Sequence, residues 1–221
     1  MLQHNMMRHR TFFILLCLLT LVCNKNALAH PHAWIDLHST AVFNEEGNIT
    51  ALKMRWLFDE FYTEFAMSDY KQAHKNVSDQ KMLLDLANDN LNSLKDHHYF
   101  TEITANKQKQ DFSSIKNITS TLEDKRIALD FTVVLATPLN PRTQIVEYRI
   151  FDPSYYIEMK HTAKKSIIFM GDAPADCAPH LTRPTPSIEL LGFATSLDKN
   201  DTAPDNLGAA FAEMVSIQCG K

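Results

Sequence analysis

Glycine and the commonest catalytic motifs are scarce or missing in this chain of 221 residues. Only five residues are glycine, and no glycine-rich phosphate-binding loop is present. The sequence also contains no CxxC, HExxH or GxSxG motif. These absences argue against the most frequent nucleotide-binding, thiol-redox, metalloprotease and serine-hydrolase classes. We therefore expect a protein that is not an enzyme.

The chain also lacks an apolar run long enough to span a bilayer, which takes about 20 residues. Its longest such run, Phe12–Cys23, follows a basic start and precedes the small-x-small sequence Ala27-Leu28-Ala29. This is the pattern of a secretory signal peptide that is removed after export. The sequence predicts a signal peptide over residues 1–29, cut after Ala29, and a periplasmic mature protein with no segment inserted in the membrane.

Basic residues are in the minority once the signal peptide is removed. The remaining 19 Lys and Arg residues are outnumbered by 26 Asp and Glu residues, which gives a formal charge of −7. An acidic surface argues against nucleic acid and anionic membranes as partners. The mature chain, residues 30–221, is long enough for a single domain with its own core.

Cysteine is rare as well, because the predicted cleavage leaves only Cys177 and Cys219. Two cysteines in an oxidising compartment most simply form one disulfide. Such a bond closes a loop of about 42 residues and contributes roughly 4 kcal/mol in the chain-entropy model. The alternative is a pair of thiolate metal ligands.

Hydrophobic periodicity predicts an α+β fold with mainly antiparallel sheet and two helices inserted after the first hairpin. Residues 33–43 and 48–57 alternate around a turn and predict that hairpin. One helix is expected to begin near Asp59 and another after Ser78. The aromatic residues around the first helix start are expected in the core; they are Trp56, Phe58, Phe61, Tyr62 and Phe65.

The second half of the chain returns to a period of two, which is typical of strands. The expected strands cover about 99–106, 109–116, 118–123, 126–136, 144–152, 155–161 and 166–170. Prolines then predict a loop or tether over 171–187 that leads to a C-terminal strand region. That region consists of a strand over 188–197, one helical turn over 207–211 and a closing strand over 214–219.

The predicted cleavage would leave His30-Pro31-His32 at the new N-terminus. On an extended strand alternate residues share a face, so His30, His32 and Asp36 are expected on one side. Imidazole and carboxylate ligands suit Zn²⁺, Ni²⁺ or Cu²⁺ and not Ca²⁺ or Mg²⁺. These three residues are the predicted metal ligands.

Proline at the second position limits how the terminus can chelate a metal. Pro31 has no amide hydrogen, so the backbone cannot wrap around Cu²⁺ or Ni²⁺. Chelation by the amine and ring of His30 remains, with His32 as a third donor. Residues i and i+4 on a strand are about 13 Å apart, so further ligands must come from elsewhere. The alternative is a solvated terminus that binds no metal.

The other histidines and acidic residues have simpler explanations. His97 and His98 are expected to end the second helix, where they suit the helix dipole. Asp59 is expected to cap the first helix and Asp152 to form a turn. Surface positions are expected for the isolated histidines, which are His74, His161 and His180.

Five segments, taken in order, resemble a family of uncharacterised periplasmic proteins encoded beside, or fused to, nickel/cobalt-type (NicO-like) membrane permeases. At least one member resembles the periplasmic component of a two-part zinc-uptake system. The matching segments span nearly the whole mature chain and are HPHAWID (His30–Asp36), RWLFDEFY (Arg55–Tyr62), HYFTEI (His98–Ile103), FDPSYYIEM (Phe151–Met159) and LGAAFAEMVSIQC (Leu207–Cys219).

The resemblance implies a metal-binding partner of a NicO-like permease, most simply for Zn²⁺, with Ni²⁺ or Co²⁺ as alternatives. It matches Asp59, Glu60 and Asp152 to the family's other acidic motif positions. Many relatives carry an acidic, EF-hand-like stretch between the two helices, but His74–Met82 has too few carboxylates for Ca²⁺. Two other functions stay open: a docking subunit that binds no metal, and a copper oxygenase with an N-terminal histidine chelate.

Overall fold

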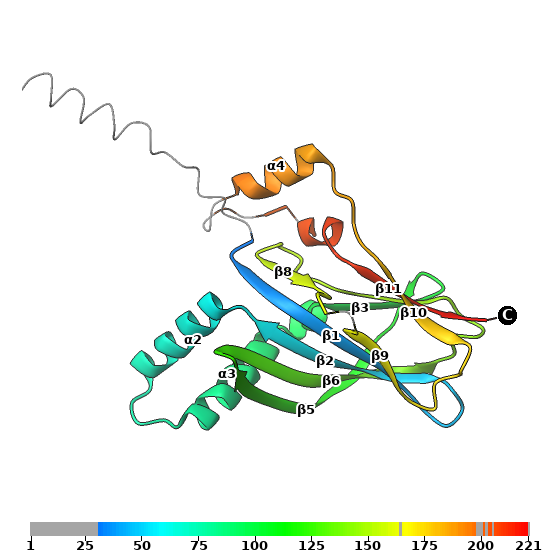
Figure 1. Cartoon of the computed structure of the whole chain (residues 1–221), viewed down its shortest axis with the longest axis horizontal. Coiled ribbons are helices and arrows are strands. Elements are labelled where there is room, and N and C mark those ends of the chain that lie inside the picture. The colour runs from blue at the N-terminus through cyan, green and yellow to red at the C-terminus, as the bar shows by residue number, and fades with distance from the viewer. Residues whose placement is uncertain (1–30, 164, 198–200, 202, 205, 221) are drawn as a thin grey trace, which may run out of the picture.

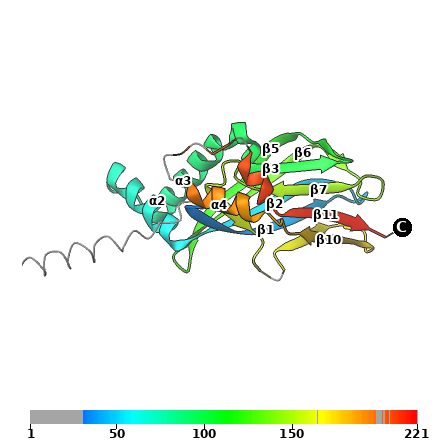
Figure 2. The same cartoon turned by 90° about the horizontal axis from the view of Figure 1, so that it is seen from above.

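The computed structural model describes residues 31–163, 165–197, 201, 203–204 and 206–220. The predicted signal peptide and His30 lie outside these residues. The strands of two β-sheets run along the long axis, with two helices at one end and the C-terminus at the other (Figures 1 and 2). In the described part of the chain, no helix has both the length and the apolar character needed to cross a membrane.

The larger sheet contains the predicted first hairpin at its centre. Its strand order is β5-β6-β2-β1-β8, and β9 also pairs with β1. β8 and β9 follow one another along the same edge of β1 and run parallel to it, whereas the other pairs are antiparallel. The strands are β1 (Ala33–Phe43), β2 (Ile49–Phe58), β5 (Phe112–Glu123), β6 (Arg126–Leu139), β8 (Ile157–Lys160) and β9 (Ile167–Gly171).

The second sheet is entirely antiparallel, with the order β10-β11-β7-β3-β4. Cys177 and Cys219 lie directly opposite one another on β10 and β11 and form a disulfide. The predicted disulfide is therefore confirmed. The strands are β3 (Thr101–Ala105), β4 (Gln108–Lys109), β7 (Val146–Ile150), β10 (Cys177–Thr182) and β11 (Met214–Cys219).

The core lies between the two sheets and follows from the alternation along each strand. On β1, Ile35 and Leu37 are buried, while Trp34 on the opposite face is 45% exposed. Trp56 packs edge-on against Phe131 at 5.0 Å between ring centroids. Such an aromatic pair contributes about 0.5–1.5 kcal/mol beyond the area that it buries. The predicted α+β architecture, dominated by antiparallel sheet, is confirmed.

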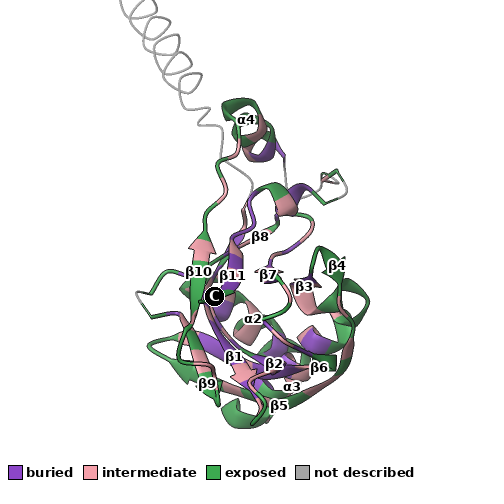
Figure 3. Ribbon diagram, turned by 90° about the vertical axis from the view of Figure 1, so that its right-hand side faces the viewer, coloured by how far each residue is buried: buried purple, intermediate pink, exposed green. Residues whose placement is uncertain are grey.

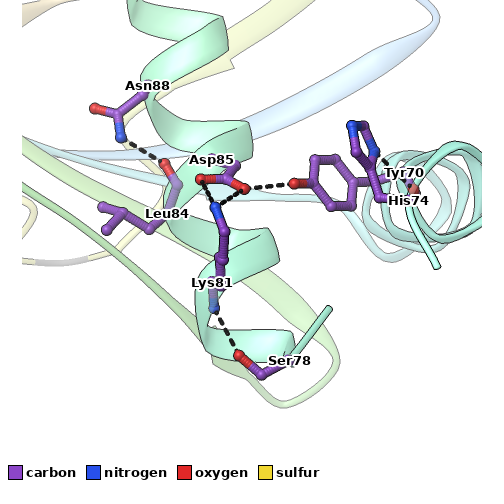
Figure 4. Close-up of polar contacts among 7 residues, drawn as sticks. All are labelled: Tyr70, His74, Ser78, Lys81, Leu84, Asp85 and Asn88. Carbon is purple, nitrogen blue, oxygen red and sulfur yellow. Dashed lines mark hydrogen bonds and ion pairs between the residues drawn. The ribbon is translucent and has the colours of Figure 1, made fainter. Parts of the chain in front are cut away.

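Two helices follow β2, as predicted: α2 (Glu60–Ala73) and α3 (Asp79–Ser93). The side chain of Ser78 accepts a hydrogen bond from the Lys81 N–H and caps α3. The Tyr70 hydroxyl donates to Asp85, which also pairs with Lys81 at 2.7 Å (Figure 4). The hydrogen bond from Lys81 lowers the pKa of the Asp85 carboxyl most, and the bond from Tyr70 lowers it further.

The aromatic residues near α2 are not all core residues. Trp56 and Phe58 are buried, but Phe61 is 83% exposed and Phe65 is 71% exposed. Thr63 of α2 is buried instead, and its hydroxyl oxygen accepts a hydrogen bond from the Ile127 N–H of β6 at 3.0 Å. The prediction for Phe61 and Phe65 is therefore wrong, because the buried face of α2 is the one that carries Thr63.

The C-terminal region differs from the prediction in two places. The stretch 171–187 contains β10, and residues 188–197, predicted as a strand, contain the helix α4 (Ile188–Ser196). Ser187 caps this helix by accepting from the Leu190 N–H at 3.2 Å. Leu190 and Ala194, four residues apart, pack on a small cluster with Tyr155 and Phe211. The single turn η2 (Leu207–Ala210) and the closing strand β11 agree with the prediction.

Candidate functional site

His32 lies immediately before β1, where the chain enters the sheet. Its backbone N–H donates to the Tyr156 carbonyl at 2.8 Å, and the two rings lie 4.7 Å apart between centroids. Tyr156 precedes β8, and the parallel pairing continues with Ala33 opposite Ile157. The first imidazole of the described chain is therefore held by backbone and ring contacts with one neighbouring segment.

Asp59 fixes the next residue of β1. One carboxylate oxygen accepts from the Trp34 N–H at 2.8 Å, and the Asp59 N–H donates to the Trp34 carbonyl at 2.9 Å. The other oxygen accepts from the Tyr62 N–H at 2.9 Å and caps α2, as predicted. Both carboxylate oxygens of Asp59 thus join the start of β1 to the start of α2.

Asp36, a predicted ligand, occupies the same face of β1 but contacts protein groups. One oxygen pairs with Arg126 at 2.8 Å, and the other accepts from the Thr162 hydroxyl at 2.9 Å. Arg126 also donates to the carbonyls of Leu57 and Phe58. Four residues along a strand span about 13 Å, so Asp36 and His32 are too far apart to share one metal ion.

Asp152 holds the turn that carries Tyr156. It is buried and accepts from the N–H groups of Ser154 and Ile157, both at 2.9 Å. Gly208 in η2 packs on the back of this turn, where an added Cβ would lie 1.9 Å from the Asp152 carbonyl oxygen. Only glycine fits this close approach, so η2, the turn and the His32 contact form one packed unit.

The acidic motif residues act as structural supports around the start of β1. Asp59 holds Trp34, Asp152 holds the Tyr156 turn, and Asp36 holds Arg126. Among the residues that the structure describes, no group of three His, Cys, Asp or Glu side chains could hold a metal ion. His30 lies outside those residues, so the ligand set of His30, His32 and Asp36 stays a prediction. Of these three residues, His32 and Asp36 are separated by about 13 Å along β1.

His97 and His98 do not end α3. They lie in the following segment η1 (Lys95–Phe100), where His98, Tyr99 and Phe100 have positive φ angles of 50°, 54° and 52°. Three successive non-glycine residues in this region cost about 1–2 kcal/mol each. The turn forms one wall of a cavity of about 270 Å³ that reaches Phe112 and Phe151.

A buried chain of polar groups connects the two sheets farther along β1. The Ser39 hydroxyl lies 2.8 Å from the Tyr148 hydroxyl and 2.9 Å from Nε2 of His161. Nδ1 and the backbone N of His161 lie 3.0 and 2.7 Å from one carboxylate oxygen of Glu213. The other oxygen is 3.3 Å from Nε of Arg183. Surface exposure was expected for His161, but it is only 4% exposed.

In this buried chain a serine contacts a histidine that contacts a glutamate, as in a catalytic triad. Its serine, however, cannot reach a substrate. Ser39 is 0% exposed, and Tyr148 occupies the other side of its hydroxyl. Burial acts to raise the pKa of the Glu213 carboxyl, but hydrogen bonds from the ring and backbone of His161 outweigh it and lower that pKa. Burial raises the pKa of Tyr148 despite its bond to Ser39. The arrangement links the sheets and offers no exposed nucleophile.

One signal in the sequence points to this network. Ser39 shares the odd-numbered face of β1 with Ile35 and Leu37, so alternation alone places a hydroxyl in the core. A buried hydroxyl requires a hydrogen-bond partner. The identity of those partners depends on which strands meet β1, and the pattern of residues around His161 and Glu213 contains no such information.

Comparison with known proteins places this chain in a protein family. Residues 15–219 match the family described as "Protein of unknown function (DUF1007)". An uncharacterized protein of Haemophilus influenzae is 30% identical over 205 residues, which cover 91% of this chain and 97% of that protein. No solved structure matches the chain. The match over nearly the full length shows that this chain belongs to the DUF1007 family.

Proposed function

We propose that the mature protein binds one Zn²⁺ at its N-terminus in the periplasm and acts with a NicO-like inner-membrane permease in zinc uptake. The ligands in this proposal are the α-amine and imidazole of His30 and the imidazole of His32. Three nitrogen donors leave one position of a tetrahedral Zn²⁺ open, which suits a metal that must be passed on. Ni²⁺, Co²⁺ and Cu²⁺ are the alternatives that these donors also accept.

The position of His32 is the observation that carries the proposal. Its backbone and ring are held against Tyr156, beside the exposed Trp34, at the point where the chain enters β1. Asp59 and Asp152 hold the neighbouring segments in turn. A rigid donor next to the predicted cleavage site reduces the ordering that metal binding requires. Asp36 serves here as a support of the strand and not as a ligand.

Calorimetry on correctly processed protein tests the site, because an N-terminal tag would block the amine. We expect about one Zn²⁺ per chain and no binding by the double variant His30→Ala/His32→Ala. His180→Ala is the matched control, since His180 is exposed on β10 and lies outside the site. Affinity should fall as the pH drops through the imidazole range near 6.5, since the ligands must be deprotonated. Unchanged zinc binding by the double variant would exclude these ligands.

A docking subunit that binds no metal is the second candidate, and the exposed Phe61 and Phe65 of α2 favour it. Deletion of the gene should slow growth only when zinc is scarce, under either function. The separating test returns His30→Ala/His32→Ala at normal abundance to the deletion strain. Failure to restore growth supports metal transfer through these residues, whereas full restoration supports docking alone.

A further inference from the structure

Most strand edges of the two sheets carry features that discourage pairing with another chain. β4 has only two residues, and β8 has four, including Glu158 and Lys160. β10 contains Pro179, which cannot donate a ladder hydrogen bond, and β5 has two register irregularities. Short, charged, proline-containing or irregular edges are the usual protection against edge-to-edge association.

β9 has none of these features. Its sequence, Ile-Ile-Phe-Met-Gly, contains no charge and no proline, and its pairing with β1 has no register shift. Among the described residues it pairs with β1 alone, so its other edge has no strand beside it. Ile168 and Met170 are 46% and 47% exposed. Figure 3 shows β9 at the side of the molecule, with exposed and intermediate segments.

The register defines which backbone groups this edge presents. Ser39 lies opposite Ile167, and its N–H donates to the Ser166 carbonyl at 2.8 Å. Backbone groups point to opposite edges at successive residues of a strand. The N–H and C=O groups of Ile167 and Phe169 therefore point away from β1, and Gly171, with a φ of 83°, ends the extended strand. A partner for this edge must be an extended strand with matching alternate groups and an apolar outer face.

We infer that β9 pairs antiparallel with β9 of a second copy of this chain and forms a symmetric dimer. With Phe169 of the two copies opposite each other, Ile167 of one copy faces Gly171 of the other across the ladder. Ile168 of one copy then lies opposite Met170 of the other on the outer face, in the pair type with the closer Cα atoms, about 4.5 Å. This register pairs the outward backbone groups of Phe169 with those of its copy and covers the exposed side chains of Ile168 and Met170.

The second copy suits this edge because β9 itself has the properties that the partner must have. It is extended and uncharged. When the two-fold axis of the dimer is perpendicular to the sheet, the inner face of each β9 still faces its own core. The contact is small, since five paired residues fall short of the roughly 1,200 Å² of a stable standard interface. A weak dimer with a dissociation constant on the order of micromolar is therefore expected. This inference does not depend on zinc binding.

Sedimentation equilibrium of the mature protein between roughly 1 and 200 μM tests the dimer. The wild type should associate reversibly within this range. Ile168→Lys/Met170→Lys places like charges opposite each other at two sites and should raise the dissociation constant at least tenfold. Ile168→Lys/Met170→Glu places opposite charges there and should restore association. The control Leu122→Lys/Ile145→Lys adds the same charge at exposed positions outside β9 and should associate like the wild type.

The outcomes distinguish the inference from its alternatives. A wild type that stays monomeric throughout the range overturns it. Equal association of the wild type and Ile168→Lys/Met170→Lys places the dimer contact elsewhere and overturns it as well. Failure of the Lys/Glu variant to associate, with its circular dichroism spectrum unchanged, overturns the antiparallel register. Zinc binding by each variant is measured separately and should equal that of the wild type.

Discussion

Replacement of Glu213 by Gln tests whether the buried polar network holds the two sheets together. The substitution keeps the size of the side chain but removes its charge. Glu213 is 3% exposed, and one of its oxygens accepts from two groups of His161, at 2.7 and 3.0 Å. Its other partner, Arg183, is largely exposed and contributes little because water screens the pair.

The expected loss follows from the two hydrogen bonds to His161. A hydrogen bond to a charged group contributes about 1.5–3 kcal/mol, against about 0.5–1.5 for a neutral one. Loss of the charge therefore removes about 1 kcal/mol per bond, or about 2 kcal/mol of the free energy of unfolding at pH 7.

The difference in unfolding free energy between the wild type and Glu213→Gln should become smaller as the pH falls. The structure lowers the pKa of Glu213 below its ordinary value. Stability from the ionised carboxylate is therefore present above the unfolded-state pKa of about 4.3 and is lost as the pH falls through the lower folded-state pKa. The gap between wild type and Glu213→Gln should be widest near neutral pH and shrink below about pH 4.

Urea unfolding followed by tryptophan fluorescence at pH 7 and at pH 3.5 measures both effects. Glu46→Gln is the control, because Glu46 lies exposed in the first hairpin turn, and a change there should stay within about 0.5 kcal/mol. A Glu213→Gln protein as stable as the wild type at pH 7, or a gap of equal size at both pH values, would refute this account of the network.

Two further predictions concern the packing around the site. Cys177→Ala/Cys219→Ala removes the covalent link between the paired strands β10 and β11 and should lower the free energy of unfolding by about 2–5 kcal/mol, while the number of zinc ions bound to folded protein stays the same. Gly208→Ala drives a methyl group into the Asp152 carbonyl and should cost about 1–3 kcal/mol and weaken zinc binding through the Tyr156 turn. Gly192→Ala in α4 is its control, because an added Cβ there meets nothing within 4 Å and should stabilise the helix by up to about 1 kcal/mol. Equal stability of the two glycine variants would contradict the proposed packing.

The sequence was sufficient to predict the central hairpin, the two helices and most strands of the second half. These elements have strong periodicity and local capping residues, such as Ser78 before α3. The sequence was not sufficient where a short apolar segment was compatible with either a helix or a strand. Residues 188–196 are mostly apolar, and only the cap at Ser187 and the packing of Ala194 in the cluster with Tyr155 favour a helix. Tertiary contacts decide such segments, and a single sequence does not contain them.

The same limit explains the exposed aromatics of α2. Helical spacing places Phe58, Phe61 and Phe65 on one stripe, and the stripe alone predicts burial. The orientation of α2 is instead set by the hydrogen bond from Ile127 to Thr63 and by the cap at Asp59. Both involve groups that contribute nothing to a hydrophobic pattern. Phe61 and Phe65 therefore point to solvent, whereas Phe58, at the end of β2, is buried.

The contacts of Asp36 show what spacing along the sequence does not contain. A carboxylate four positions after an imidazole suits a metal site, yet the strand that aligns these side chains on one face also separates them by the rise of each residue. The charge of Asp36 is neutralised within the sheet by Arg126, which is itself anchored to β2 carbonyls. In the proposed function, the metal donors at the start of β1 therefore come from residues before the strand. One proposed donor is a histidine whose α-amine is freed by cleavage, so the proposed site depends on correct cleavage after Ala29.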